Sequence, residues 1–343
     1  MKVVVLVGGE GTRLRPLTYT TPKPLLPIAN QAHLERQLAW LAAHGVDEAV
    51  LSMGYLPDAF HNHFAHDAQG NDVFGDMRLR YAVEDEPLGT AGAIRFAAEG
   101  IDERFVVCNG DVLTDTDLGA MVEFHDSCGA EATISLTQVD DPSAFGVVPT
   151  RDDGAVIAFV EKPPPGKAPS NWINAGTYVL EPSFLERIPE RLNVSVERET
   201  FPRMLEQPGL LYGYKTDAYW LDIGTPEKYL QAQLDVMDGR TGGSPVAGRV
   251  LLGDGAHVDE GAHVSDSVIG ARAVVEAGAR VEHSVLHAGV RVSHGSTVRD
   301  SIVGADSVLK PEVALSALTI IGAGMTVPSG STISGGRLPS DRA

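Results

Sequence analysis

A glycine-rich turn near the start of the chain could bind phosphate groups. Residues 3–7 form a continuous aliphatic run that leads directly into Gly8, Gly9 and Gly11, with Arg13 close behind. Glycines let the backbone come close to a phosphate and direct several N–H groups at it. The turn is not a P-loop, because no Gly-Lys-Ser/Thr follows, and its third glycine has the wrong spacing for a dinucleotide-binding turn. A tight turn between a strand and a helix is the alternative interpretation.

Charge and composition limit the classes of partner. The formal net charge is −19 over 343 residues, and a nonspecific nucleic-acid binder needs a basic face, so nucleic acid is excluded. No apolar run approaches the roughly 20 residues of a membrane span, and the first residues become glycine-rich too early for a signal peptide. Cys108 and Cys128 give neither a disulfide framework nor a zinc-ligand spacing, so a cytoplasmic protein is expected. His61, His63 and His66 are interpreted as a solvated helix end rather than a metal site.

Apolar runs alternate with helical patterns in the first part of the chain, and these elements must position the glycine turn. Strands are predicted over residues 3–7, 48–53, 105–107, 132–139 and 155–160, and helices over residues 32–44 and 118–125. A continuous aliphatic run is typical of a central parallel strand, so the alternation predicts an α/β fold with a doubly wound, Rossmann-like sheet. Ligands of such sheets bind beyond the carboxyl ends of the strands, where Gly8 and Asp111 lie.

The last part of the chain contains a repeat of 17 residues. Leu252, Ile269, Leu286, Val303 and Ile320 recur at this spacing, and apolar residues step by six within each period. Sides of six, six and five residues fit one turn of a triangular solenoid, in which aliphatic side chains stack in columns. Phe, Trp and Tyr are absent from this part, as a narrow interior requires. The pattern resembles the left-handed parallel β-helix of hexapeptide-repeat proteins.

These two patterns divide the chain into domains. The α/β domain is assigned to residues 1–238, a Gly- and Ser-containing linker to 239–246, the β-helix to 247–336 and a tail to 337–343. Many hexapeptide-repeat proteins are acyltransferases that use a histidine base and a projecting loop, but no repeat here is interrupted by a long insertion. The β-helix is therefore expected to stabilise the protein and to support a homo-oligomer.

Ordered motifs in the α/β domain resemble those of the sugar nucleotidyltransferases, also called nucleotide-sugar pyrophosphorylases. The signature is Gly8-Gly9-Glu10-Gly11-Thr12-Arg13-Leu14-Arg15-Pro16-Leu17-Thr18, followed by Pro22-Lys23-Pro24. Further matches follow in order at residues 86–92, 109–111, 145–147, 160–163, 174–176 and 220–224. Within the family the chain is most similar to the mannose-1-phosphate guanylyltransferase branch, on residues 6–9, 87–92 and 195–202 and on the attached hexapeptide domain.

The resemblance implies transfer of a nucleotidyl group from a nucleoside triphosphate to a sugar 1-phosphate, with release of pyrophosphate. GTP and mannose 1-phosphate are the expected substrates, and GDP-mannose is the expected product. The attacking phosphate has a second pKa near ~6, so it is already ionised at neutral pH and the site needs cations and backbone donors rather than a general base. The alternatives are a glucose-1-phosphate thymidylyl-, uridylyl- or adenylyltransferase, a non-catalytic subunit that binds nucleotide sugar, and a bifunctional acyltransferase.

The resemblance also assigns roles to single residues. It implies that Arg13 lies across the β- and γ-phosphates, that Lys23 neutralises the α-phosphate, and that Asp111 and Asp222 share a Mg²⁺ ion. The residues expected at the nucleotide are Gly8, Gly9, Gly11, Thr12, Arg13, Glu84, Gly89 and Thr90. Those expected at the sugar phosphate are Gly146, Glu161, Lys162, Asn174, Gly176 and Glu197. Glu84 could accept hydrogen bonds from guanine N1–H and N2–H, and an exposed surface acid is the alternative.

Overall fold

The computed structural model describes residues 1–66, 70–207 and 209–340. The chain forms two compact units, one of residues 1–9 and 37–220 and the other of residues 10–36 and 221–343. This division differs from the predicted boundary at residues 239–246, because residues 10–36 pack with the C-terminal part of the chain. In the part of the chain that the structure describes, no helix has the length and apolar character needed to cross a membrane.

The first unit is built on a mixed sheet with the strand order β12-β11-β13-β8-β1-β4-β7-β6-β5. Strands β8, β1, β4 and β7 run parallel at its centre. The aliphatic runs predict β8, β1 and β4, whereas β7, in which apolar and charged residues alternate, is not among the predicted strands. Strand β13 is antiparallel to β8 and to β10, so antiparallel strands extend the Rossmann-like centre. The strands are β1 (Lys2–Leu6), β4 (Glu48–Met53), β5 (Ala65–His66), β6 (Asp72–Phe74), β7 (Met77–Val83), β8 (Phe105–Asn109), β10 (Ala132–Gln138), β11 (Gly146–Val147), β12 (Val160–Glu161), β13 (Trp172–Leu180) and β14 (Leu211–Lys215).

Helices cover this sheet and enclose its core. The two helices that the sequence predicts are confirmed as α1 (His33–Ala43) and α4 (Leu118–Cys128), and Asp117 caps α4 by accepting a hydrogen bond from the Ala120 N–H. Helix α3 (Gly89–Ala97) packs on β1 and β4. The shorter helices are α2 (Pro57–His61) and α5 (Phe201–Met204). The core includes fully buried Phe105 and Tyr178.

One predicted strand of the first unit is wrong. Residues 155–160 form no continuous strand: Ala155 and Val156 make isolated bridges, and β12 begins only at Val160. The segment is apolar, but Ile157 is 56% exposed, so its side chains do not all enter the core. An apolar run by itself therefore overestimated the strand, because such a run does not tell which neighbour the backbone pairs with.

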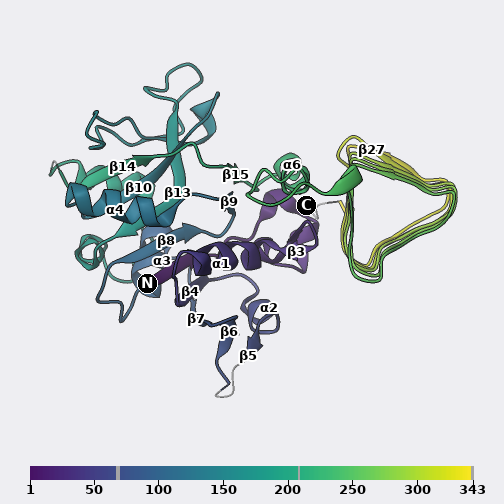
Figure 1. Cartoon of the computed structure of the whole chain (residues 1–343), viewed down its shortest axis with the longest axis horizontal. Coiled ribbons are helices and arrows are strands. Elements are labelled where there is room, and N and C mark those ends of the chain that lie inside the picture. The colour runs from purple at the N-terminus through teal and green to yellow at the C-terminus, as the bar shows by residue number, and fades with distance from the viewer. Residues whose placement is uncertain (67–69, 208, 341–343) are drawn as a thin grey trace. The chain divides into compact units, whose positions relative to one another are not determined.

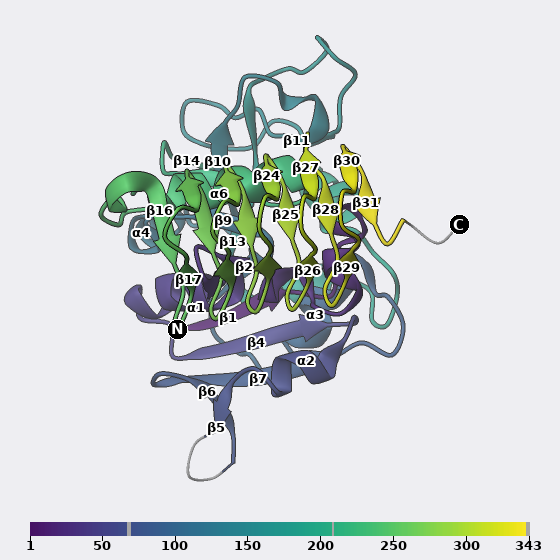
Figure 2. The same ribbon diagram turned by 90° about the vertical axis from the view of Figure 1, so that its right-hand side faces the viewer.

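The C-terminal part of the second unit is a coil with three parallel sheets, as expected for a left-handed β-helix. The coil is triangular in end view (Figure 1), and its strands stack in register along the side (Figure 2). The first sheet contains β16 (Val250–Leu252), β19 (Ser267–Ile269), β22 (Val285–Leu286), β25 (Ile302–Val303), β28 (Ile320–Ile321) and β31 (Arg337–Leu338). The second contains β17 (His257–Val258), β20 (Val274–Val275), β23 (Arg291–Val292), β26 (Val308–Leu309) and β29 (Thr326–Val327). The third contains β18 (His263–Ser265), β21 (Arg280–Glu282), β24 (Thr297–Arg299), β27 (Ala314–Ser316) and β30 (Thr332–Ser334).

The repeat of the coil changes at its last full turn. Leu286 pairs with Val303 at the predicted spacing, but Val303 pairs with Ile321 rather than with Ile320. The extra residue lies at a corner, where Ala317 and Leu318 both have positive φ angles, of 52° and 60°. Ile321 therefore takes the interior position that the sequence assigns to Ile320. The coil also extends through β31, so Arg337 and Leu338 are not part of a tail.

Residues 10–36 and helix α6 (Pro226–Met237) belong to the same unit as the coil. The hairpin of β2 (Pro27–Ile28) and β3 (Gln31–Ala32) packs on α6, which also contacts β19. The Asn30 side chain donates to the Ile269 carbonyl at 3.1 Å. Tyr229 on α6 donates to the Pro27 carbonyl and bonds to His287 of the coil at 3.0 Å. This contact buries His287, so burial lowers the pKa of its imidazole to about 4.

The buried His287 should make the unit less stable in acid. The folded-state pKa of about 4 lies below the ordinary value of 6.5, so the unfolded chain binds the proton more readily. This contribution to stability is complete above pH 6.5 and is lost as the pH falls towards 4, by up to about 3 kcal/mol. Denaturant unfolding at several pH values should show this loss in the wild type and not in His287→Asn. The exposed His257→Asn control should titrate like the wild type, and equal pH profiles for all three proteins would contradict the assignment.

Candidate functional site

The first unit brings Gly8 and Asp111 to one edge of the parallel sheet, as predicted. The Gly110 N–H donates to the Leu6 carbonyl at 2.9 Å, and a Cβ at Gly110 would lie 2.7 Å from that oxygen. The chain therefore needs glycine where it passes from β8 to Asp111. A Cβ at Gly8 would lie 3.2 Å from the Gly54 nitrogen beyond β4. These close backbone approaches fix the carboxyl ends of β1, β4 and β8 next to one another.

Glu84 supports the loop that precedes α3. Its two carboxylate oxygens accept hydrogen bonds from the Ser52 hydroxyl, at 3.2 Å, and from the Leu88 N–H, at 2.9 Å. Glu84 is also half-buried, so it differs from the exposed surface acid of the alternative interpretation. A carboxylate oxygen has more than one lone pair, so these bonds leave acceptor capacity for a ligand. Contact of Glu84 with a base stays a prediction.

The start of α3 is joined to residues 193–197. The Thr90 hydroxyl donates to the Glu197 carboxylate at 2.7 Å and accepts from the Val196 N–H at 2.8 Å. Gly89 has a φ of 69°, and a Cβ there would lie 2.6 Å from the Val194 carbonyl oxygen, so another residue would strain this approach. Thr90 is expected at the nucleotide and Glu197 at the sugar. The structure brings these two residues together in one hydrogen-bonded group.

A buried tyrosine organises the residues expected at the sugar. The Asn174 side chain donates to the Tyr178 hydroxyl at 2.9 Å and accepts from the Gly176 N–H at 2.9 Å. Burial raises the Tyr178 pKa well above its ordinary value, and the carboxylates of Glu197 and Glu161 raise it further. The register of β13 against β10 shifts between Asn174 and Tyr178, so both reach the same group. Asn174 thus bonds to a neutral hydroxyl whose pKa is also raised by the charges of Glu161 and Glu197.

Gly146 makes room for protein side chains. A Cβ at Gly146 would lie 2.8 Å from the Phe159 ring and 2.9 Å from the Glu161 carboxylate, so the neighbouring strand β12 explains the glycine. Lys162 follows β12 with a φ of 49°, which is uncommon for a residue with a side chain. Its side chain is 60% exposed, and its Nζ lies 3.7 Å from the Glu161 carboxylate. Lys162 therefore presents an accessible cation next to the Asn174 group.

In the second unit, the glycine turn continues into three short 3-10 helices, Thr12–Leu14, Leu17–Tyr19 and Lys23–Leu25. Gly11 has a φ of 61° and precedes the 3-10 helix Thr12–Leu14. The Thr18 hydroxyl donates to the Gly11 carbonyl at 2.9 Å, and a Cβ at Gly11 would lie 3.0 Å from that of Lys23. Lys23 starts the 3-10 helix Lys23–Leu25 between two prolines and is 7% exposed. The turn and the Lys23 backbone are therefore packed against each other.

Arg13 and Asp222 approach each other across Gly224. A Cβ at Gly224 would lie 2.5 Å from Arg13 Nη2 and 2.7 Å from Asp222 Oδ1. The Gly224 N–H donates to Asp222 Oδ1 at 2.8 Å, and Lys228 Nζ lies 3.7 Å from Asp222 Oδ2. Asp222 ends β15 (Trp220–Asp222), and Lys228 lies in the first turn of α6. The second unit thus gathers two cations around one carboxylate.

The shared Mg²⁺ site of Asp111 and Asp222 stays a prediction. Asp111 and Asp222 both offer carboxylate oxygens, which Mg²⁺ prefers, and Mg²⁺ often takes only one or two protein carboxylates. Asp111 follows β8 and β9 (Val112–Thr114) begins immediately after it, in the first unit, whereas Asp222 belongs to the second. Among the residues described, no group of three or more His, Cys, Asp or Glu could hold a metal ion.

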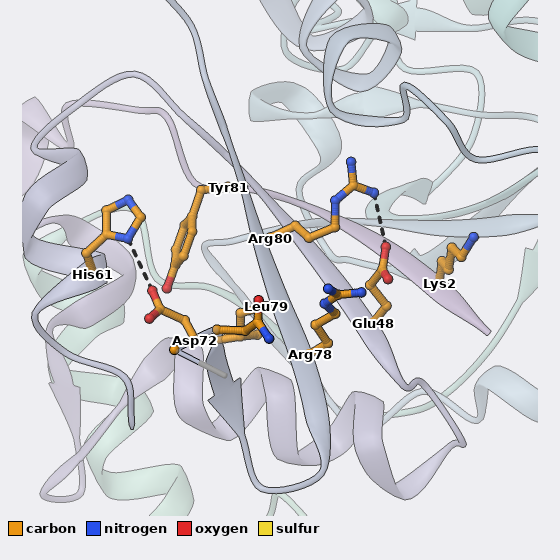
Figure 3. Close-up of a pocket in the computed structure, with 10 residues that line it drawn as sticks. Lys2, Glu48, His61, Asp72, Arg78, Leu79, Arg80 and Tyr81 are labelled. Carbon is orange, nitrogen blue, oxygen red and sulfur yellow. Dashed lines mark hydrogen bonds and ion pairs between the residues drawn. The ribbon is translucent and has the colours of Figure 1, made fainter. Parts of the chain in front are cut away.

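A separate polar cleft lies at the other end of the parallel strands (Figure 3). His61 and His66 both contact the buried Asp72 carboxylate, the former at 3.1 Å. Burial raises the Asp72 pKa, but hydrogen bonds from Tyr81 and the two histidines outweigh burial and hold it below its ordinary value. His61 ends α2 and His66 lies in β5, and both pair with the Asp72 carboxylate.

Sequence reasoning missed several residues of these groups. Tyr178 resembles any aromatic residue of a buried strand, and only its pairing with Asn174 distinguishes it. Gly224 is in the predicted motif, but its role as the contact between Arg13 and Asp222 has no sequence signal. Lys228 lies two residues after Pro226, where a helix start could have been predicted from the Thr225 cap.

Comparisons with known proteins give the family. The Nucleotidyl transferase family profile matches residues 2–239, and the GMPPB C-terminal domain profile matches residues 246–340. A mannose-1-phosphate guanylyltransferase of Mycobacterium tuberculosis is 40% identical over 293 residues, which cover 83% of this chain and 79% of the relative. Mannose-1-phosphate guanylyltransferase 1 of Arabidopsis thaliana is 38% identical over 336 residues, which cover 94% and 91%.

A solved structure has the same fold in its matched part. The crystal structure of HddC from Yersinia pseudotuberculosis has a TM-score of 0.58 and 32% identity, and the match covers 68% of this chain and 99% of HddC. The structure of HddC complexed with GMP-PN gives a TM-score of 0.57. The chain therefore belongs to the Nucleotidyl transferase family and is an enzyme of that family.

Proposed function

We propose that this enzyme transfers a guanylyl group from GTP to mannose 1-phosphate and forms GDP-mannose and pyrophosphate. The observation that carries the proposal is the similarity to proteins named mannose-1-phosphate guanylyltransferase over 94% of the chain, at 38% identity in one case. The HddC relative solved with GMP-PN further supports a guanine nucleotide. The groups around Arg13 and around Tyr178 would supply the cations and the sugar-binding acceptors that such a reaction needs.

The reaction is a displacement at the α-phosphorus of GTP. A phosphate oxygen of the sugar 1-phosphate forms a bond to this phosphorus, and the bond to the bridging oxygen of the pyrophosphate breaks. Because the nucleophile is already ionised, the main tasks are to align the two polyanions and to stabilise the charge that develops. These tasks require no proton transfer from the protein.

In our proposal, positively charged side chains align the two substrates and stabilise the developing charge. Arg13 would bind the β- and γ-phosphates, since its planar fork suits bidentate contacts with phosphate. Lys23 would neutralise charge at the α-phosphate. Lys162, which is exposed beside Glu161, would bind the phosphate of the sugar. Main-chain N–H groups of the protein would contact the nucleotide at Gly8, Gly9, Gly11 and Thr12.

Three acceptors around Tyr178 would select the sugar. Asn174 bonds to the Tyr178 hydroxyl, and the charges of Glu161 and Glu197 act on its pKa. All three side chains carry oxygens that can accept hydrogen bonds from sugar hydroxyls. Gly176 would supply a backbone contact in the same group, and Gly146 allows Glu161 to lie there. Because Thr90 bonds to Glu197, the residues expected at the nucleotide and at the sugar are linked.

Asp111 and Asp222 would hold a Mg²⁺ ion in our proposal. When bound, the ion would neutralise phosphate charge and stabilise the leaving pyrophosphate. Gly224, which donates to Asp222, would orient this carboxylate.

Three finer features belong to the proposal. Glu84, Gly89 and Thr90 would face the base, and a carboxylate at Glu84 matches guanine better than thymine or uracil. Both cysteines are free, and Cys108 is buried in the sheet, which favours the reducing cytoplasm.

The chain would self-associate through its coil, where Leu252 is half exposed. The mass of the full chain in solution tests this self-association.

A panel of substrates tests the function directly. Four nucleoside triphosphates are combined with mannose 1-phosphate and glucose 1-phosphate, and pyrophosphate release is measured with Mg²⁺. We expect GTP with mannose 1-phosphate to give the highest kcat/KM. Preference for another base with glucose 1-phosphate would favour a thymidylyl-, uridylyl- or adenylyltransferase, and no turnover with any pair would favour a regulatory subunit.

A further inference from the structure

The last strand of the coil contacts the backbone that carries Arg13. Arg337 in β31 donates from Nη1 to the Arg15 carbonyl at 2.9 Å and from Nη2 to the Arg13 carbonyl at 3.1 Å. Arg337 lies 322 positions after Arg15 and 324 positions after Arg13 in the sequence. All three residues belong to the second unit. The coil therefore contacts the main chain of Arg13 and Arg15.

The two hydrogen bonds restrict the main chain from which the Arg13 side chain extends. The Arg13 carbonyl lies within the 3-10 helix Thr12–Leu14, and Arg15 is the residue that ends it. The last carbonyls of a helix have no partner within the helix, and a planar guanidinium can satisfy two of them at once. Since the Arg13 side chain starts from this backbone, a fixed backbone narrows the positions that its guanidinium can reach.

A second contact holds the same turn against the coil. A Cβ at Gly322 would lie 3.1 Å from Pro16 and 3.2 Å from Pro339, so the turn after β28 lies close to both prolines. Arg15 has its own partner, since its guanidinium binds the Glu10 carboxylate at 2.7 Å. Arg337 therefore acts on the Arg13 and Arg15 main chain, and the Gly322 contact fixes the residue that follows.

We propose that Arg337 is a positioning residue, which holds the Arg13–Arg15 backbone so that the Arg13 guanidinium is aligned for the triphosphate. This inference rests on the proposed function, in which Arg13 binds the β- and γ-phosphates. It gives the β-helix a role in triphosphate binding within a single chain. The effect of Arg337 should then fall on the triphosphate and not on the sugar phosphate.

Steady-state kinetics of the full-length protein test this role. Arg337→Ala should raise the KM for the triphosphate about tenfold, because the turn is less well ordered, and should change the KM for the sugar 1-phosphate less than about twofold. Arg337→Lys keeps the charge but loses the planar fork, so it should recover only part of the affinity. Arg291→Ala is the matched control, since Arg291 is an exposed coil residue that pairs with Glu276.

The possible outcomes separate this inference from the proposed function. Wild-type turnover with a triphosphate is measured first, and its absence would refute the proposed function. If the wild type is active, equal kinetics of Arg337→Ala and Arg291→Ala would overturn the inference. Equal rises in both KM values, or a melting temperature that falls in parallel with activity, would assign Arg337 a general structural role and would also overturn it. If Arg337→Lys had the wild-type KM for the triphosphate, the positive charge at this position would be sufficient, and the positioning role of the planar guanidinium would be refuted.

Discussion

Asp111→Asn should lower kcat by at least about 100-fold at saturating Mg²⁺, because it removes charge from the proposed metal site while keeping the size of the side chain. Asp222→Asn should have a similar effect. Its remaining carbonyl oxygen can still accept the hydrogen bond from the Gly224 N–H, so the local backbone should be retained. Both variants should also require more Mg²⁺ for half-maximal rate. Pyrophosphate release over a Mg²⁺ titration measures both effects.

The control for these variants removes one carboxylate charge elsewhere in the same unit as Asp111. Asp102 is exposed in the loop before β8, so Asp102→Asn should keep a wild-type rate and Mg²⁺ dependence. Circular dichroism and the melting temperature check that the variants are folded. Near-wild-type rates of either Asp111→Asn or Asp222→Asn at saturating Mg²⁺ would remove the metal assignment, whatever the control does.

Local patterns predicted the parts of the fold in which one segment decides its own structure. The aliphatic run of residues 3–7 became β1, shifted by one residue at each end, because a strand at the centre of a parallel sheet is apolar on both faces. The coil could be predicted because each turn needs buried aliphatic residues at the same spacing as the turn before it. Its register failed only at Ala317 and Leu318, where two residues other than glycine take positive φ angles. No sequence signal announces such a corner.

Contacts between distant segments could not be predicted. The pairing of Arg337 with the Arg13 carbonyl spans 324 positions, so neither residue type nor local spacing points to it. The same holds for Tyr178, whose neighbours Glu161 and Glu197 come from separate segments. The family motifs predict which residues belong to the candidate site, but they do not predict the contacts between them. The close approach of Gly146 to Glu161 and the hydrogen bond from Thr90 to Glu197 are examples. These relations depend on tertiary packing.

The acidic net charge gives the local cations more importance. A chain with a net charge of −19 should not attract a triphosphate over long distances. Affinity for the triphosphate must therefore come from short-range contacts with Arg13 and Lys23 and from backbone N–H groups. Such contacts depend on geometry much more than a diffuse field does. Small displacements of Arg13 should then have large effects on turnover.

Gly224→Ala should lower kcat/KM for the triphosphate about 100-fold, because it displaces two of the proposed functional side chains at once. The new Cβ would lie 2.5 Å from Arg13 Nη2 and 2.7 Å from Asp222 Oδ1, and both distances are shorter than a carbon atom permits. The Arg13 side chain is flexible and can move away, so the fold should survive. A misplacement of about 1 Å at a reacting group can cost a factor of about 100 in rate.

Gly243→Ala is the matched control for this variant. A Cβ at Gly243 meets no described atom within 4 Å, and its φ is not in the positive range, so alanine should be tolerated there. Both variants should keep the wild-type melting temperature, and only Gly224→Ala should lose activity. A Gly224→Ala enzyme as active as Gly243→Ala would mean that the Arg13 guanidinium can leave its position over Gly224 without loss of turnover. The role of Arg13 at the triphosphate would then have to be abandoned.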